Sequence, residues 1–106
     1  MACMVHLTGV QILVITHVDF AASARKDLRR VPEQILRRLR AWVDHVEHVG
    51  LEAARQRPGY HDEPLRGDRA GQRSVRLNRA WRAVYVLTDD DTVEVVLVIE
   101  VNKHDY

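Results

Sequence analysis

The sequence predicts an α+β domain in which a hairpin of two helices packs across a small, twisted, mainly antiparallel four-stranded sheet. Two observations indicate this fold class. Apolar residues recur at helical spacing between residues 20 and 49, and three short segments rich in β-branched residues follow residue 72. Another β-branched segment precedes the helices, so the expected order of elements is β-α-α-β-β-β.

The first strand is expected at residues 10–16, a short run made mostly of Val, Ile and Leu. Asp19 is well suited to cap the helix that follows. In that helix, spacing places four apolar side chains on one face: Phe20, Ala24, Leu28 and Val31.

A longer second helix is expected after Val31, with Pro32 in its first turn and Glu33 at its positive end. Steps of four, three, four and three residues separate the members of its apolar stripe: Ile35, Leu39, Trp42, Val46 and Val49. Gly50 is expected to end this helix, and a short helical piece follows at residues 51–57.

Residues 58–72 contain two prolines and three glycines without a periodic pattern, which indicates a loop. Beyond it, Val75 and Leu77 alternate with polar residues, as expected of a strand with one polar face. Further strands are expected at residues 81–87 and 93–101, with a turn at 89–92. The last three strands should form an antiparallel meander.

The totals favour one soluble domain spanning residues 1–106. Its hydrophobic fraction of 46% and charged fraction of 29% are those of an ordinary globular protein, not a disordered one. The early apolar run at residues 12–15 is far too short for a membrane span. Cys3 is the single cysteine, so no disulfide can form within the chain, which suits the reducing cytoplasm where we expect the protein.

Charge is distributed unevenly although the net charge is only +1. The balance is +4 for residues 20–57, +3 for residues 58–82 and −5 for residues 83–106. The basic two-thirds of the chain can attract a polyanion, whereas the last hairpin cannot. A solvated charged face remains the alternative explanation of this pattern.

No metal or cofactor site is expected. His45 and His48 are three residues apart on the long helix, but no HExxH motif, cysteine pair or carboxylate motif accompanies them. Surface histidines explain the pattern better than metal ligands do.

Arg82 interrupts an otherwise apolar strand, so its guanidinium requires an anion, a carbonyl partner or solvent. One interpretation is a solvent-facing position. The other is a guanidinium aimed at a phosphate from the concave face of the sheet. Only a short connection separates this strand from the preceding one, which carries Arg76, so antiparallel pairing can bring both guanidinium groups toward one site.

The last strand ends in a cluster of reactive side chains, Lys103, His104 and Tyr106. Cleavage of a phosphodiester by a 2′-hydroxyl needs a proton acceptor, a proton donor and cations for the developing charge. Histidine is the side chain type that titrates near neutral pH, so His104 is a candidate for proton transfer. Lys103 and the arginines supply cations, and Tyr106 can stack on a base. A plain surface location is the alternative for His104.

Three segments together resemble the RelE/ParE superfamily of bacterial type II toxins, close to its HigB-like and RelE-like ribonuclease branches. These segments are "PLRGDRAGQRSVRLN", "WRAVYV" and the closing "VNKHDY". The resemblance extends over the whole chain and implies the RelE-like fold. It also implies a small cytoplasmic toxin that is held inactive by a cognate antitoxin, with which it can form a hetero-oligomer, and that has no membrane partner.

The resemblance also implies roles for individual residues. Arg82 matches the arginine that contacts the scissile phosphate, and Arg76 the basic position of the preceding strand. Lys103 and His104 match the cationic or imidazole pair after the last strand, with His104 as general acid or base. Tyr106 matches a C-terminal aromatic whose spacing varies among branches.

The Gly-rich loop is expected to add a flexible basic rim that binds the RNA backbone through Arg66, Arg69 and Arg73. Tyr60 and His61 also lie in this loop, where they have either a structural role or contact with RNA.

The expected function is therefore that of a metal-independent endoribonuclease toxin that cleaves mRNA, in the ribosomal A site, and inhibits translation. Its products would be a 2′,3′-cyclic phosphate and a 5′-hydroxyl. Two alternatives remain open from the sequence: a non-enzymatic ParE-like toxin that targets gyrase, and a degenerate toxin that only binds its antitoxin.

Overall fold

The computed structural model describes residues 3–7, 10–90 and 93–103 of the chain. In chain order its elements are β1 (Cys3–Leu7), β2 (Val10–Val14), β3 (His17–Phe20), α1 (Ala22–Asp27), η1 (Leu28–Arg30), α2 (Glu33–Val49), α3 (Leu51–Arg55), η2 (Pro58–Tyr60), β4 (Glu63–Pro64), η3 (Gly67–Arg69), β5 (Arg73–Arg76), β6 (Trp81–Asp90) and β7 (Val93–Lys103). The η elements are single turns of 3₁₀ helix.

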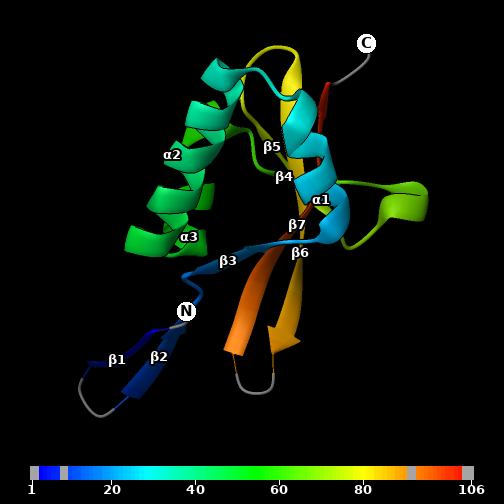
Figure 1. Ribbon diagram of the computed structural model, residues 1–106. Helices are drawn as coiled ribbons and strands as arrows, with labels where there is room; N and C mark the ends of the chain where they lie inside the picture. The colour runs from blue at the N-terminus through cyan, green and yellow to red at the C-terminus, as the bar shows by residue number, and fades with distance from the viewer. Residues whose placement is uncertain (1–2, 8–9, 91–92, 104–106) are drawn as a thin grey trace.

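The main sheet has the strand order β3-β7-β6-β5-β4 (Figure 1). Strand β3 runs parallel to β7, and all other neighbours are antiparallel. The predicted α+β class and the meander of the last three strands are confirmed. The sheet has five strands instead of four because residues 63–64, inside the expected loop, form the short edge strand β4.

The segment predicted as the first strand is a strand, but it does not belong to the main sheet as expected. Residues 10–14 form β2, which pairs only with β1 in a separate hairpin that extends away from the sheet (Figure 1). The strand that enters the main sheet is β3, at residues 17–20. Both segments have strand-like composition, and the tertiary pairing with β7 decides which of them joins the sheet.

Asp19 consequently lies within β3 and does not cap a helix. Helix α1 begins after Ala21, which makes no side-chain cap, and its backbone N–H donates to the carbonyl of Val98 at 2.8 Å. Pro32 is the residue before the first turn of α2, not part of that turn. Gly50 ends α2 as predicted, and its φ of 88° is the left-handed conformation that favours glycine.

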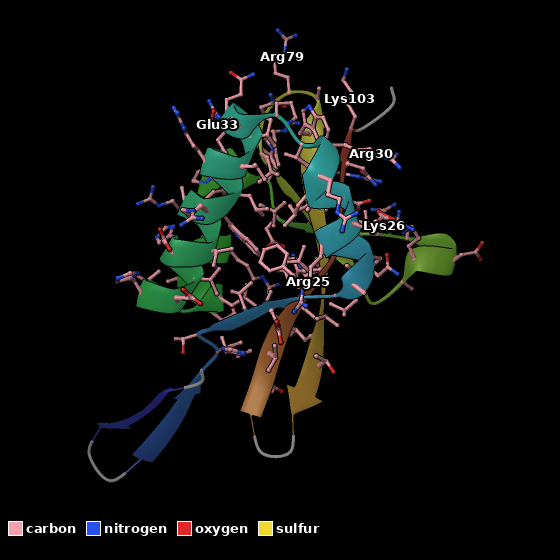
Figure 2. All side chains as sticks on the ribbon, viewed as in Figure 1. Arg25, Lys26, Arg30, Glu33, Arg79 and Lys103 are labelled. Carbon is pink, nitrogen blue, oxygen red and sulfur yellow. The ribbon has the colours of Figure 1, made fainter. Side chains whose placement is uncertain are left out.

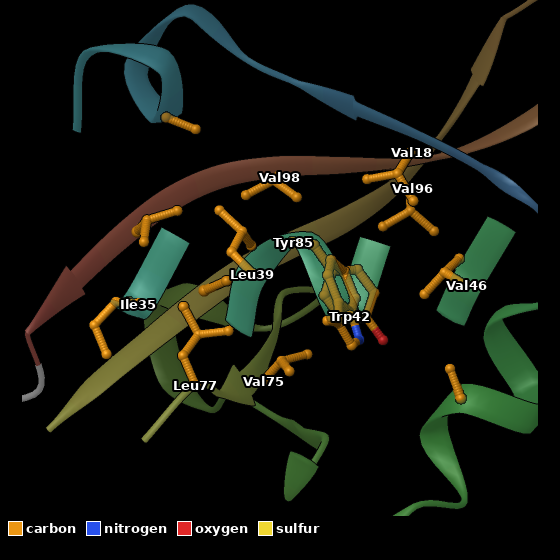
Figure 3. Packing of buried hydrophobic residues seen from close by; sticks show 14 of the residues in the cluster. Val18, Ile35, Leu39, Trp42, Val46, Val75, Leu77, Tyr85, Val96 and Val98 are labelled. Carbon is orange, nitrogen blue, oxygen red and sulfur yellow. The ribbon is translucent and has the colours of Figure 1, made fainter. Parts of the chain in front are cut away.

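The core lies between the helices and one face of the main sheet (Figure 3). Trp42 of α2 and Tyr85 of β6 are both fully buried, with ring centroids 5.5 Å apart. The predicted stripe of α2 accounts for the helical side of this core through Ile35, Leu39, Trp42 and Val46, whereas Val49 is exposed. Burying these large side chains fixes α2 against one face of the sheet. On the opposite face Ser74 and Val84 are also buried, whereas Arg76 is exposed.

No helix among the described residues is long and apolar enough to cross a membrane.

Candidate nucleic-acid interface

Three polar side chains lie in a row across the last three strands. Arg76 of β5 pairs with Arg82 of β6, and Arg82 pairs in turn with Asn102 of β7. Directly opposed residues project from the same face of a sheet, so these three side chains are neighbours. The register therefore brings the two arginines together, as the short connection between their strands led us to expect. We call this set the polar row.

The polar row lies on the face of the sheet opposite the helices. Val75, Ala83 and Val101 adjoin its members in sequence, and all three belong to the core that packs against α2. Successive side chains of a strand point to opposite faces. Arg76, exposed in this structure, and Arg82, half-buried, therefore project away from the core.

Hydrogen bonds hold the polar row in place. Nε of Arg82 donates to Oδ1 of Asn102 at 3.4 Å, and Nδ2 of Asn102 donates to Oε2 of Glu100 at 3.0 Å. The same Glu100 oxygen accepts from the guanidinium of Arg69 at 2.8 Å. Because Arg69 balances the charge of Glu100, the positive charge of Arg82 remains available to an anion.

A cleft of about 260 Å³ lies over one end of the polar row. Its lining comes from residues 61–65, from β5, from the connection between β5 and β6, and from the start of β6. The lining residues are His61, Glu63, Leu65, Ser74, Arg76, Asn78, Arg79, Ala80, Trp81 and Arg82. Three arginines face one carboxylate in this lining, so the cleft favours an anionic ligand.

The connection between β5 and β6 is a tight turn built around Asn78. Its Oδ1 accepts hydrogen bonds from the backbone N–H groups of Ala80 and Trp81, both at 2.7 Å. The N–H of Leu77 closes the turn by donating to the carbonyl of Trp81 at 2.9 Å. This turn sets the short separation between Arg76 and Arg82 and gives them a rigid base.

His61, an exposed residue, also lines the cleft. Its backbone has φ 44° and ψ 49°, which is the left-handed region. Among the described residues, it is the only one other than glycine with a positive φ. This region is uncommon for residues other than glycine, although Asn, Asp and His are found in it more often than the rest. From the sequence, His61 was expected to have either a structural role or contact with RNA.

A buried network anchors the loop that carries His61. Asp62, with a side chain 1% exposed, accepts from Nε of Arg73 and from the hydroxyl of Tyr85, both at 2.6 Å. Burial, followed by the hydrogen bond and charge of Asp62, raises the pKa of Tyr85, which therefore keeps its proton. The network fixes His61, the residue adjacent to Asp62, relative to the sheet.

The expected basic rim takes a different form. Arg73 is paired with Asp62, and Arg69 is paired with Glu100 and also donates to Gln72 at 2.8 Å. These two guanidinium groups hold the loop on the protein instead of standing free along its edge. Arg66, the third member of the rim, is exposed.

Asn102, rather than Lys103, is the neighbour of Arg82. Lys103 pairs with Trp81, so the alternation of the strand turns it toward the other face. Figure 2 shows exposed Lys103 and Arg79 extending from the same end of the molecule. His104 and Tyr106, the expected general acid or base and the aromatic partner, lie outside the described residues.

The two histidines of α2 have protein partners. Nδ1 of His45 lies 3.4 Å from the hydroxyl of Tyr60, and Nδ1 of His48 lies 2.7 Å from the carbonyl oxygen of Asp44. Across residues 3–7, 10–90 and 93–103, no three metal-ligating side chains of the His, Cys, Asp and Glu types come together.

The chain is a small α+β protein with a cationic cleft at one end of its sheet, and the solved structures that are similar to it in fold include bacterial toxins. A YoeB/ParE toxin from Agrobacterium tumefaciens is 20% identical with a TM-score of 0.63; the match covers 84% of this chain and 99% of that one. The toxin–antitoxin complex RelBE2 from Mycobacterium tuberculosis contains a chain 27% identical, with a TM-score of 0.58, covering 83% and 96%. A YafQ mutant from E. coli is 18% identical, with a TM-score of 0.61, covering 82% and 91%.

The chain thus has the fold of the RelE/ParE toxin superfamily, and the resemblance inferred from its sequence is confirmed at that level. No protein-family model matches the sequence, and a search of curated proteins finds no significant match.

Proposed function

We propose that this protein is the toxin of a toxin–antitoxin pair and that it cleaves RNA at the polar row. The observation that carries the proposal is the alignment of Arg76, Arg82 and Asn102 across three strands, next to a cleft lined by both arginines in which arginines outnumber carboxylates. Guanidinium groups bind phosphate through paired hydrogen bonds, and fixed cations stabilise the extra charge of a pentacoordinate phosphate.

The proposed reaction is attack by the 2′-hydroxyl of RNA on the adjacent phosphate. A bond forms between O2′ and phosphorus while the bond to O5′ breaks. A base takes the proton of the 2′-hydroxyl, and an acid gives a proton to the departing O5′. The products are a 2′,3′-cyclic phosphate and a 5′-hydroxyl, and Arg82 is placed to bind the phosphate throughout.

General acid–base catalysis at this site needs a proton acceptor and a proton donor within reach of the phosphate, and imidazole is the commonest such group. His61 lines the cleft and is rigidly held through Asp62, so we assign it one of the two proton-transfer roles. His104 follows the end of β7 by one residue and is proposed for the other role. Lys103 and Tyr106 are proposed to assist through charge and base stacking.

An antitoxin is the proposed protein partner. Two structures with this fold were solved as toxin–antitoxin complexes, RelBE2 and DinJ–YafQ, at 27% and 20% identity to this chain. Messenger RNA on the ribosome is the proposed substrate.

The test is induction of the protein in bacteria without a partner, followed by mapping of mRNA 5′ ends. We expect growth to arrest and translation to stop before replication stops. New 5′-hydroxyl ends should appear in mRNA and should be absent after induction of Arg82→Ala. Intact mRNA accompanied by an early DNA-damage response would favour gyrase poisoning instead. Comparing cleavage of free RNA with cleavage on programmed ribosomes then separates a general nuclease from a ribosome-dependent one.

A further inference from the structure

A second, larger cleft of about 640 Å³ lies on the helix side of the connection between β5 and β6. Arg38 and Ala41 of α2 form one wall, and the turn from Arg57 to Tyr60 forms another. The end of β5 and the connection that follows it, residues 76–79, close the third side. The lining therefore combines three segments that are distant in the sequence.

Four arginines line this larger cleft, and no carboxylate does: Arg38, Arg57, Arg76 and Arg79. Arg38 donates to the carbonyl oxygen of Leu77 at 3.2 Å and so joins α2 to the connection. Within the described part of the chain, neither Arg57 nor Arg76 takes part in an ion pair. The lining therefore contains positive charge and no carboxylate to balance it.

The larger cleft is continuous with the cleft over the polar row. Arg76, Asn78 and Arg79 line both of them, from the two sides of one turn. A ligand that repeats its negative charge along a chain can bind both clefts at once, with Arg76 between them. The apolar atoms of Ala41, Pro58 and Leu77 in the lining offer surface to the less polar parts of such a ligand.

We propose that the larger cleft is a second subsite for single-stranded RNA, which binds a phosphate that flanks the one held at Arg82. The inference rests on the proposed function and extends it, because it gives the RNA a path across the β5–β6 turn. Continuity with the polar row favours a nucleic-acid strand over an acidic protein segment, since a strand spans both clefts with evenly spaced phosphates.

The experiment measures binding of a 2′-O-methylated oligonucleotide of ten residues, which cannot be cleaved, by fluorescence anisotropy over a series of salt concentrations. The variant is Arg57→Gln, because the Arg57 side chain makes no ion pair that holds the described fold together. The matched control is Arg40→Gln, an exposed arginine of α2 that lines neither cleft. Each phosphate contact with a single strand contributes about −0.7 to the slope of log K against log salt.

We expect Arg57→Gln to weaken binding of the ten-residue oligonucleotide and to reduce the magnitude of its salt slope by about 0.7. Arg40→Gln should keep the wild-type slope, and a dinucleotide should bind all three proteins alike. Equal slopes for the two variants would overturn the second subsite. A salt slope for poly-glutamate binding that falls with Arg57→Gln, while the slope for the oligonucleotide does not, would overturn it as well.

Failure of the proposed function gives a separate result. If the wild type cleaves unmodified RNA while the variants have equal slopes, only the second subsite is wrong. If the wild type cleaves no RNA on or off the ribosome, the proposed function is wrong, whatever the slopes.

Discussion

Arg73 and Arg76 lie three residues apart on the same short strand, yet the fold gives them opposite environments. Arg73 shares the core-facing side of β5 with Val75 and is bound to a carboxylate that is 1% exposed. Arg76 projects from the other side, is exposed, and stands beside Arg82. An odd separation along a strand places two side chains on opposite faces, which accounts for the difference.

The comparison separates arginines that hold the structure together from arginines that present charge. A guanidinium paired with a buried carboxylate has its charge balanced, and removing either partner leaves the other poorly solvated. A guanidinium without such a partner attracts phosphate and contributes little to stability. Arg69 also has its charge balanced, although its partner Glu100 is only half-buried, and Arg82 belongs with Arg76 in the second group.

The largest effect on stability is expected from Asp62→Ala. The change leaves the guanidinium of Arg73 and the hydroxyl of Tyr85 without their acceptor. Breaking a buried pair costs roughly 3–5 kcal/mol, and we expect the lower end because the Arg73 side chain is 24% exposed. Urea unfolding measures the loss.

Glu33→Ala is the matched control for that measurement. Its ion pair with Arg37, at 3.6 Å, joins side chains that are 82% and 78% exposed, so the loss should stay below about 1 kcal/mol. Similar losses for the two variants would show that the Asp62 network contributes no more than a surface pair.

A smaller loss is expected from Tyr85→Phe, which removes one hydrogen bond to a carboxylate, worth about 1.5–3 kcal/mol. The variant should also change how the free energy of unfolding depends on pH in the alkaline range. The pKa of Tyr85 is raised in the fold, so its contribution is fully present below the unfolded value of about 10 and is lost as pH rises above it.

Stability should therefore fall less steeply above pH 10 in Tyr85→Phe than in the wild type. Tyr60, whose pKa burial also raises, is present in both proteins and cancels in the comparison. Parallel alkaline limbs in thermal melts would contradict the assignment of a protonated, buried Tyr85.

The smallest effect is expected from Arg76→Gln. Because Arg76 is exposed, the change should leave the unfolding midpoint unchanged. Binding of an uncleavable single strand should lose about 0.7 from the magnitude of its salt slope, whereas Arg73→Gln should instead lower stability. A variant of Arg76 that unfolds early but binds RNA normally would remove the distinction between the two arginines.

Periodicity in the sequence was sufficient to predict the helix pair and the meander. The stripe from Ile35 to Val46 is long and regular, and tertiary packing agrees with it. Two strand-like segments follow one another before Ala21, however, and only pairing with β7 selects residues 17–20 for the sheet. Strand β4 has just two residues and cannot be distinguished from a loop by any periodic signal.

For the site, alternation on each strand predicted that Arg76 and Arg82 could meet, and the register agrees. The place of Asn102 beside Arg82 depends on the irregularity between Val84 and Tyr85, which shifts the register of β6 against β7 and has no mark in the sequence. The alternation of Glu100 and Asn102 on one strand was the available signal for that residue. The pairing of Arg69 with Glu100 and of Arg73 with Asp62 depends on contacts between distant parts of the chain. The sequence alone therefore could not distinguish these two arginines from Arg66, which is exposed.

The central claim is tested most directly by measuring cleavage and unfolding of Arg82→Ala and Arg73→Ala side by side. Single-turnover cleavage on programmed ribosomes reports the chemistry, and thermal melts report the fold.

For Arg82→Ala we predict a loss of about 10²–10³-fold in rate, about 2.7–4 kcal/mol of transition-state stabilisation, with an unchanged Tm. Arg82→Lys should recover part of the rate, because a point charge replaces the fork of the guanidinium. Arg73→Ala should instead lower Tm clearly while the molecules that remain folded keep cleaving RNA. An Arg82→Ala protein that cleaves at the wild-type rate, or that loses Tm as Arg73→Ala does, would contradict the account.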